Sequence, residues 1–411
     1  MTIGVPGTDY KSCIMKNAGE DRLKEVIAQN LSVLENQVEY NSRNGIRLFR
    51  ISSDIIPFGS SPVNALSWKD LYEPQLTRIG DKIRAGNMRV SMHPGQYTVL
   101  NSPNEVVYAR ASEDLVYHAQ LLNSLHTGPE NKIILHIGGV YGEKKEAARR
   151  FAARYEGLDQ SVKQRLVIEN DEKLYDICDV LEISGKTGAP AVFDNLHHAI
   201  HPCPASESEI SWIRACRQTW KPQDGRQKIH YSQQAPGKKP GAHSDSIRIE
   251  EFLSFYDRIE GENLDIMLEV KDKNLSAVKC INCTDTVSRP TRLELDWSRY
   301  KYLILEKAPA IYLQIRELLK DRSDNQALAF YRLIELAMQQ EASTGNIENA
   351  ALHVWGYFKY TASESQKNQF FRILKQIRGT NTGAARCKNY LLRLAQLYNQ
   401  KYLLDSLYLY L

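Results

Sequence analysis

The sequence lacks long hydrophobic runs and has few cysteines. No stretch approaches the roughly 18 apolar residues of a membrane span, and the N-terminal residues MTIGVPGTDYKSC are too polar for a signal peptide. The 7 cysteines are odd in number and scattered, so we expect free thiols and no disulfide framework. These absences predict a cytoplasmic protein without a membrane partner.

The sequence also lacks a large excess of either positive or negative charge. The 411 residues include 53 Lys and Arg and 49 Asp and Glu, which gives a formal charge of +4. The hydrophobic fraction of 42% and charged fraction of 25% exclude wholesale disorder. Such a balance neither requires nor excludes a nucleic-acid partner, because local basic clusters would have to supply any phosphate contacts.

The first 275 or so residues alternate β-rich runs with stretches of helical periodicity. The expected strands are residues 2–5, 46–51, 88–92, 132–137, 165–168, 191–193, 227–231 and 265–270. Eight strands, separated by helix-like stretches, predict a TIM (β/α)8 barrel within a first domain of residues 1–283. The G-x-G-x-x-G fingerprint is absent after the first strand, which disfavours a dinucleotide-binding fold.

Strand-like runs disappear after about residue 284. The remaining amphipathic segments have helical period and cover residues 300–319, 325–340, 346–360, 363–378 and 384–402. We therefore predict a separate all-helical domain over residues 284–411.

Carboxylates and imidazoles follow most of the predicted strands, where the active site of such a barrel is built. The candidates are Asp54, His93, His136, Glu169, Asp194, His197, His230, His243 and Glu269. Each alone could be structural, but together they would place repelling carboxylates around one mouth. The mixed oxygen and imidazole donors favour two or three Mn²⁺ or Zn²⁺ ions. A cluster of metal ions is suited to phosphodiester cleavage.

Lys228 lies two residues before His230, so both side chains are expected to face the barrel mouth. A lysine aimed at metal ions is costly unless it is neutral, carbamylated or in contact with phosphate. An ion pair with Asp194 is the alternative explanation.

Two other segments could contact DNA. Gln96 and Tyr97 follow a Pro-Gly turn beside His93, and an amide with an aromatic ring could enter a base stack. Packing of Tyr97 on the barrel rim is the alternative. Lys238 and Lys239 lie in a Gly- and Pro-rich loop and could contact phosphates, although a solvated loop explains them almost as well.

The barrel region resembles the UV damage endonuclease (UvdE/UvsE) family. The matching stretches are RISSD at 50–54, MHPGQY at 92–97, LHIGG at 135–139, LVIEND at 166–171, FDNLHH at 193–198, KIHYS at 228–232, GAHSD at 241–245 and MLEVK at 267–271. The resemblance implies a TIM barrel with a trinuclear, typically manganese, site. It also implies an endonuclease that nicks damaged double-stranded DNA immediately 5′ to UV photoproducts, without a glycosylase step.

The resemblance also assigns roles to residues. The metal ligands would be His93, His136, Glu169, Asp194, His197, His230, His243 and Glu269. Lys228 matches a lysine that can be carboxylated beside the metals, and Gln96 and Tyr97 match residues that probe the lesion. We expect Glu169, Lys228 and Glu269 to act in catalysis.

Two positions depart from the family pattern. Asp54 stands where a histidine is expected after the second strand, which puts the metal preference of that position in question. The first strand lacks the expected aromatic near Val5, and Tyr10 is the candidate to replace it in lesion binding.

The C-terminal region resembles the YbgA-like helical domain of unknown function. The resemblance rests on Trp297 to Leu303, on LHVWGYFK at 352–359 and on the tyrosine-leucine ending. His353, Trp355 and Tyr357 could form a site there, but core aromatics and a helix cap explain them more simply.

Three alternative functions remain open from the sequence. An apurinic-site endonuclease of the endonuclease IV type would have the same barrel fold and a site for three metal ions. A sugar isomerase of the xylose-isomerase type also has a metal-lined mouth, but gives no purpose to Gln96 and Tyr97. A non-catalytic DNA-damage-binding protein would bind lesions without metal-dependent turnover.

Overall fold

The computed structural model describes residues 3–5, 7–285, 290–320, 326–377 and 382–411. Contacts between Cα atoms divide the chain into two compact units. Residues 8–247 and 254–276 form the first unit; residues 248–253 and 277–411, with the N-terminal segment before residue 8, form the second. The predicted domain boundary at residue 283 stays a prediction.

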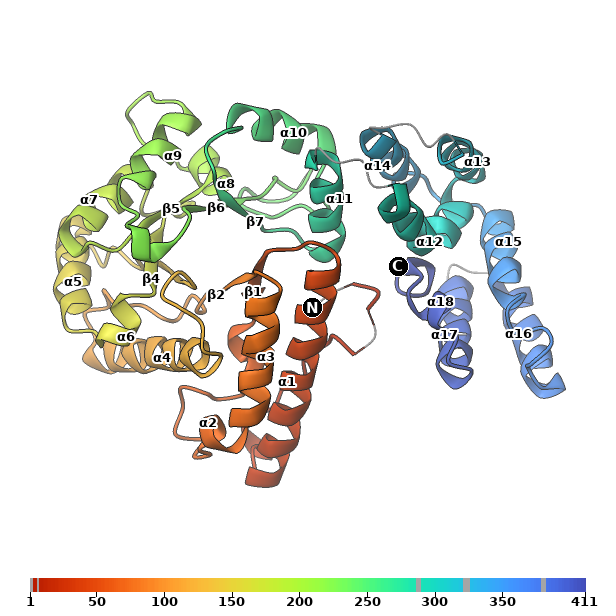
Figure 1. The fold of residues 1–411 in the computed structure, drawn as a ribbon, viewed down its shortest axis with the longest axis horizontal. Helices are drawn as coiled ribbons and strands as arrows, with labels where there is room; N and C mark the ends of the chain where they lie inside the picture. The colour runs from red at the N-terminus through yellow and green to blue at the C-terminus, as the bar shows by residue number, and fades with distance from the viewer. Residues whose placement is uncertain (1–2, 6, 286–289, 321–325, 378–381) are drawn as a thin grey trace. The chain divides into compact units, whose positions relative to one another are not determined.

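Seven parallel strands form one sheet in the first unit, in sequential order (Figure 1). They are β1 (Leu48–Ile51), β2 (Arg89–Met92), β3 (Ile133–His136), β4 (Leu166–Glu169), β5 (Ala191–Asp194), β6 (Lys228–Tyr231) and β7 (Asp265–Leu268). The first and last strands also contact each other, so the sheet is a nearly closed barrel. The prediction of a TIM-barrel-like fold with an additional helical region is confirmed.

The expected strand at residues 2–5 is wrong, and the described residues contain seven strands where eight were predicted. Gly4 has a φ of +67°, which a strand does not allow, and it lies in a turn. The carbonyl of Ile3 accepts a hydrogen bond of 3.2 Å from Arg299 of the helical unit. This segment therefore belongs to the second unit, where it packs on helices and adds no strand to the barrel.

One helix precedes the first strand, one follows the last strand, and the others connect successive strands. They are α1 (Glu20–Arg43), α2 (Trp68–Leu71), α3 (Glu73–Ala85), α4 (Glu105–Ser124), α5 (Lys144–Glu156), α6 (Gln160–Lys163), α7 (Ile177–Thr187), α8 (Asn195–Ile200), α9 (Glu209–Arg217), α10 (Ile249–Arg258) and α11 (Asn274–Thr284). Helix α1 buries Leu23, Ile27, Leu31 and Leu34 at spacings of three and four residues, as expected of an amphipathic helix.

The central strands are buried on both faces, as parallel strands between helices must be. Every residue of β4 and β5 is buried. Ile134, Val167 and Val192 from three neighbouring strands form a fully buried cluster, against which Trp220 packs. This apolar layer holds the strands firmly, so the polar residues at their C-terminal ends have fixed positions.

The second unit is helical. It includes the start of α10 and most of α11. Its further helices are α12 (Pro290–Lys307), α13 (Pro309–Leu318), α14 (Gln326–Met338), α15 (Thr344–Trp355), α16 (Glu364–Ile377), α17 (Thr382–Leu397) and α18 (Lys401–Leu404). Trp355 is 6% exposed and stacks on Phe370 with ring centroids 4.4 Å apart. Its position agrees with the simpler explanation of that residue as a core aromatic.

The expectation of free thiols throughout is wrong for one pair of cysteines. Cys178 in the first turn of α7 and Cys203 after α8 form a disulfide across 25 residues of sequence. The fold brings these two segments together, and spacing along the chain gives no sign of it. Cys13, Cys216, Cys283 and Cys387 are free thiols, as expected.

No helix in the described part of the chain combines the length and apolar character that a bilayer crossing requires.

Candidate metal centre

The parallel register brings the predicted metal ligands together in pairs. His136, the last residue of β3, lies opposite Glu169, the last residue of β4. Asp194, the last residue of β5, lies opposite His230 on β6. Because the strands run in the same direction, these side chains gather at one end of the barrel, as predicted.

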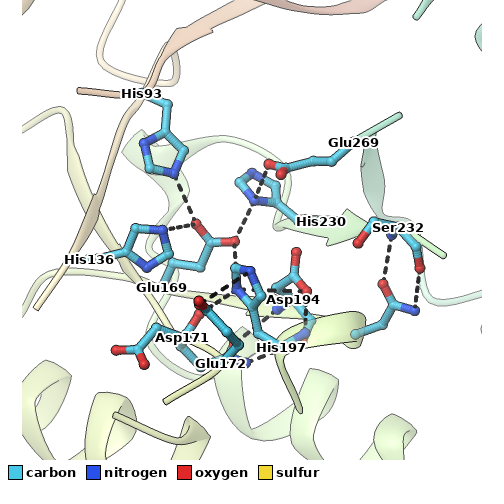
Figure 2. Close-up of polar contacts among 12 residues, drawn as sticks. His93, His136, Glu169, Asp171, Glu172, Asp194, His197, His230, Ser232 and Glu269 are labelled. Carbon is cyan, nitrogen blue, oxygen red and sulfur yellow. Dashed lines mark hydrogen bonds and ion pairs between the residues drawn. The ribbon is translucent and has the colours of Figure 1, made fainter. Parts of the chain in front are cut away.

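Glu169 lies at the centre of the cluster (Figure 2). Its side chain is 1% exposed. Its Oε2 lies 3.3 Å from Nε2 of His93 and 3.7 Å from Nε2 of His136. Its Oε1 lies 2.6 Å from Nδ1 of His230. Side chains from three other strand ends thus converge on one buried carboxylate.

His230 lies between two carboxylates, because its Nδ1 is also 3.1 Å from Oε1 of Glu269. Burial disfavours the charged imidazole, but Glu169 and Glu269 outweigh that cost and raise the pKa of His230 to about 9. Burial alone would raise the pKa of Glu169, yet the neighbouring imidazoles hold it well below its usual range. The carboxylates therefore attract positive charge into this pocket.

Asp194 joins the cluster from the start of α8. Its Oδ1 accepts the backbone N–H of His197 at 2.8 Å and caps the helix. Burial raises the pKa of Asp194 to about 7, although nearby His197 opposes the shift. This geometry holds His197 beside the cluster, with its Nδ1 3.8 Å from Asp194 and 4.0 Å from Glu169.

Two histidines are oriented by backbone carbonyls. Nδ1 of His197 lies 2.9 Å from the carbonyl oxygen of Asn170, and Nδ1 of His93 lies 3.1 Å from that of Pro94. A carbonyl can only accept, so each Nδ1 carries the proton and donates. In the neutral ring the lone pair is then on Nε2, as in histidines that bind metal ions.

His243 and Glu269 complete this end of the barrel. A short antiparallel bridge joins Gln234 and His243 at the base of the loop after β6. Nδ1 of His243 lies 3.8 Å from Oε2 of Glu269, which directly follows β7. Burial lowers the pKa of His243, which favours its neutral, metal-binding form.

The donor set fits divalent metal ions. Two groups at this end of the barrel have ligand atoms within 4.8 Å of one another: His93, His136 and Glu169; and Glu169, Asp194, His230 and Glu269. Three buried atoms of these groups have no hydrogen-bond partner among the described residues: Nδ1 of His136, Oδ2 of Asp194 and Nε2 of His230. Unpartnered buried polar atoms are costly, and bound cations would satisfy atoms such as Oδ2 and Nε2.

Asp54 lies apart from these groups. It is exposed on the 3₁₀ turn Ser53–Ile55, and its backbone N–H donates to Oγ of Ser52 at 3.3 Å. None of the three groups of potential metal ligands found among the described residues includes it. A role for Asp54 as a ligand stays a prediction.

Sequence reasoning missed Arg50, which forms an ion pair with Glu269 between the first and last strands. Burial would raise the pKa of Glu269, but Arg50 and His230 hold it well below its usual range. The available signal was a charged residue inside the otherwise apolar strand Leu48–Ile51.

His118 of α4 was also missed, because only strand ends were searched. It is fully buried, and its Nε2 lies 3.0 Å from Oγ of Ser53. Ser53 in turn lies 2.7 Å from the backbone carbonyl of His93, to which its hydroxyl can donate. His118 therefore supports the turn that carries His93.

Lys228 is 1% exposed at the start of β6. No ion pair joins it to Asp194 among the described residues, so that alternative is not supported. Burial, with smaller contributions from Arg89 and Arg50, holds the pKa of Lys228 well below its usual range. Burial thus makes the neutral amine easier to form than in an exposed lysine.

Gln96 and Tyr97 are exposed next to the buried ligands. The ring of Tyr97 is 66% exposed and lies over Gly95, where a Cβ atom would come within 2.3 Å of it. The ring thus covers the backbone of the turn and is otherwise exposed, and the alternative of a tyrosine packed on the barrel rim stays open.

The other candidate DNA contacts are more dispersed. Lys238 and Lys239 are exposed in a loop closed by a 2.7 Å hydrogen bond from Ala235 to Ala242. The hydroxyl of Tyr10 donates to Gln37 of α1 at 2.6 Å. The lesion contact expected of Tyr10 stays a prediction.

Comparisons with known proteins agree with this geometry. Residues 4–298 match the family UV-endonuclease UvdE. A protein named UV DNA damage endonuclease from Clostridium perfringens (strain 13 / Type A) is 43% identical over 314 residues, which cover 75% of this chain and 76% of the relative. A protein of the same name from Bacillus cereus (strain B4264) is 31% identical over 277 residues, which cover 67% of this chain and 86% of the relative.

A solved structure supports the same relationship. The crystal structure of SacUVDE has 42% sequence identity and a TM-score of 0.63, and the match covers 66% of this chain and 91% of that one. Residues 301–411 match a second family, described as a protein of unknown function (DUF1722). The chain therefore belongs to the UV-endonuclease UvdE family and carries a helical region of unknown function at its C-terminal end.

Proposed function

We propose that the chain is a metal-dependent endonuclease that nicks damaged double-stranded DNA immediately 5′ to UV photoproducts, both cyclobutane dimers and 6-4 photoproducts. The observation that carries this proposal is the convergence of His93, His136 and His230 on the buried carboxylate of Glu169. Such a donor set suits a group of divalent metal ions, and phosphodiester cleavage is the chemistry that closely spaced ions serve best.

Two or three ions would bind here, with Mn²⁺ favoured and Zn²⁺ as the alternative for a mixed oxygen and imidazole donor set. The proposed ligands are His93, His136, Glu169, Asp194, His197, His230, His243 and Glu269, with Asp54 as a further candidate. When bound, the ions would polarise the scissile phosphodiester and neutralise the charge that develops on it.

The chain's own residues prepare the pocket for this chemistry. The carbonyls of Pro94 and Asn170 bind Nδ1 of His93 and His197, which leaves Nε2 as the atom that would bind a metal ion. Arg50 keeps Glu269 ionised. We assign Glu169, Glu269 and Lys228 to the reaction, and the neutral amine of Lys228 is the form that can add carbon dioxide and lose a proton to give a carbamate.

Lesion recognition would fall to the exposed residues beside the pocket. Photoproducts weaken stacking and pairing, so extruding the lesion costs less there than in intact DNA. Gln96 and Tyr97 would enter the space that opens, since base–aromatic stacking contributes about 1–3 kcal/mol. Lys238 and Lys239 would contact phosphates, and Tyr10 is a further candidate.

A strand-specific nicking assay tests the proposal. Matched duplexes would carry a thymine dimer, a 6-4 photoproduct, an abasic site or no damage, each with Mn²⁺ and with a chelator. We expect nicks with a 3′ hydroxyl immediately 5′ to both photoproducts, lost with the chelator. Preference for abasic DNA would favour an apurinic-site endonuclease. Lesion binding without metal-dependent cleavage would favour a damage-binding protein.

A further inference from the structure

A cavity of about 430 Å³ lies within the C-terminal helical unit. It is lined by residues of α12, α13, α15 and α18 (Figure 1). Its volume is within the range of about 300–1,000 Å³ typical of ligand pockets. The barrel chemistry proposed above uses none of its residues.

Two helices each place an aromatic ring and a cation on the same face. Trp297 and Lys301 are four residues apart on α12, and Tyr312 and Arg316 are four residues apart on α13. Residues at this spacing are neighbours on a helix surface. The two helices thus present the same pair of chemical groups to one cavity.

The aromatic rings of the lining fall into two groups, Trp297 with Tyr312 and Tyr302 with Tyr402. The rings of Trp297 and Tyr312 have centroids 5.3 Å apart and are tilted by 46°. Tyr302, which is 4% exposed, lies edge-on to Tyr402 at 6.4 Å. Tyr402 also stacks on Tyr357, with centroids 5.7 Å apart. These contacts hold the rings rigidly, so a planar ligand can stack without ordering them first.

The lining contains two cations, Lys301 and Arg316. Neither Lys301 nor Arg316 forms an ion pair with a carboxylate in the described part of the chain. Burial, together with the repulsion of Arg316, lowers the pKa of Lys301. Glu294 is the acidic residue of the lining and is exposed. The lining therefore has an excess of positive charge beside its aromatic faces.

A ligand that satisfies both features must combine a planar ring with an anionic group. We propose that this cavity binds a nucleotide through its base and phosphate, either as a free nucleotide or as an unpaired nucleotide of single-stranded DNA. The base would stack on the aromatic lining formed by Trp297, Tyr312 and Tyr402, while Lys301 and Arg316 would contact the phosphate.

Photo-crosslinking of the full chain provides a site-specific test. The probes are 5-bromodeoxyuridine 5′-monophosphate, a short single-stranded oligonucleotide with one 5-bromouracil, and 5-bromodeoxyuridine without phosphate. Adducts are mapped by mass spectrometry of peptides. We expect adducts on Trp297, Tyr312 or Tyr402 with at least one phosphorylated probe, and far fewer with the nucleoside.

The two sources of nucleotide give different results. Adducts with the monophosphate alone would indicate a free nucleotide, whereas stronger labelling by the oligonucleotide would indicate single-stranded DNA. Adducts confined to residues 8–276, or labelling that does not depend on the phosphate, would overturn the proposal. So would an acidic peptide that displaces the probes at lower concentration than thymidine monophosphate does.

Charge variants give an independent measurement. Lys301→Gln combined with Arg316→Gln should weaken binding of the labelling probe about tenfold, as expected for lost charge-assisted hydrogen bonds. Lys359→Gln is the matched control. The ammonium of Lys301 lies over the ring of Tyr302 at 4.9 Å, and that of Lys359 lies over the ring of Tyr360 at 4.5 Å but outside the cavity lining. Equal effects of the double variant and the control would contradict the proposal.

This test of nucleotide binding is independent of the test of nuclease activity in the barrel. Photoproduct nicking should be unchanged in Lys301→Gln/Arg316→Gln, and circular dichroism should show an unchanged helical content. Loss of nucleotide labelling with normal nicking would therefore assign the binding to the helical unit. If nicking itself were absent from the wild-type chain, the crosslinking result would still decide this proposal.

Discussion

The carboxylate of Glu169 lies 2.6 Å from the imidazole of His230, although 61 residues separate them in the sequence. Each group changes the pKa of the other, because burial leaves little water to screen their charges. The same buried carboxylate faces His93 and His136. Glu169 is thus the residue whose charge the rest of the pocket depends on.

Replacing Glu169 with glutamine should therefore abolish most of the nicking activity. The amide keeps the size of the side chain but removes the charge that attracts metal ions, so we expect a loss on the order of 10²–10³-fold. Lesion binding, measured by fluorescence anisotropy, should remain detectable. Glu113→Gln, an exposed position on α4, should behave as wild type. Unchanged nicking in Glu169→Gln would remove this residue from the mechanism.

Arg50→Met should shift the pH dependence of nicking. Arg50 lowers the pKa of Glu269, so without it Glu269 takes up a proton at higher pH. The acidic limb of the rate–pH profile should therefore move to higher pH, and the rate near neutral pH should fall about tenfold. Arg50→Lys keeps the charge but not the planar fork, so it should restore part of the activity. An unmoved acidic limb would contradict this role.

Metal binding should release protons and weaken as the pH falls. His230 has a pKa of about 9 and is protonated below that pH, whereas a metal ligand must be neutral. This group alone should lower the Mn²⁺ affinity about tenfold per pH unit below 9. Asp194, with a pKa of about 7, adds a second proton below neutral pH.

Calorimetric titration of Mn²⁺ into chelator-treated protein measures this linkage. Comparing buffers with different ionisation enthalpies gives the number of protons released. The number should be near one at pH 8 and should rise towards pH 6. An affinity that does not change between pH 7 and pH 9 would be evidence against His230 as a ligand.

Tyr97→Ala should reduce the preference for damaged DNA. Its ring is exposed, and losing one stacking contact of about 1–3 kcal/mol corresponds to roughly tenfold or more in affinity. The ratio of kcat/KM for photoproduct and undamaged duplexes is the measurement. Tyr97→Phe should keep the preference, and Tyr360→Ala, at a still more exposed tyrosine in the helical unit, should not alter it. Loss of activity without loss of the preference for damaged DNA would argue against insertion of the Tyr97 ring into the duplex.

Removing the disulfide should lower the stability of the barrel. Cys178 and Cys203 close a loop of 25 residues, so Cys178→Ser should reduce the free energy of unfolding by about 3 kcal/mol. Urea denaturation under oxidising conditions measures this difference. Cys13→Ser, at a free thiol, is the control. The wild type and Cys178→Ser should become alike once a reductant is added, and a persisting difference would indicate another cause.

The periodicity of apolar residues along the chain was enough to predict the barrel and the all-helical region that follows it. Seven of the expected strands exist because apolar β-branched runs such as Ile133–Leu135 must be buried between helices. The N-terminal run failed because Gly4 adopts a turn and the segment packs with Arg299, a contact that no local pattern contains.

The sequence by itself determined which residues stand at the strand ends, since strand ends follow from local patterns of apolar residues. Parallel pairing then brought His136 to Glu169 and Asp194 to His230. Only the tertiary structure decided that Arg50 meets Glu269 and that Cys178 meets Cys203. Such pairs depend on strand closure and helix packing, which set distances between segments that no local spacing encodes.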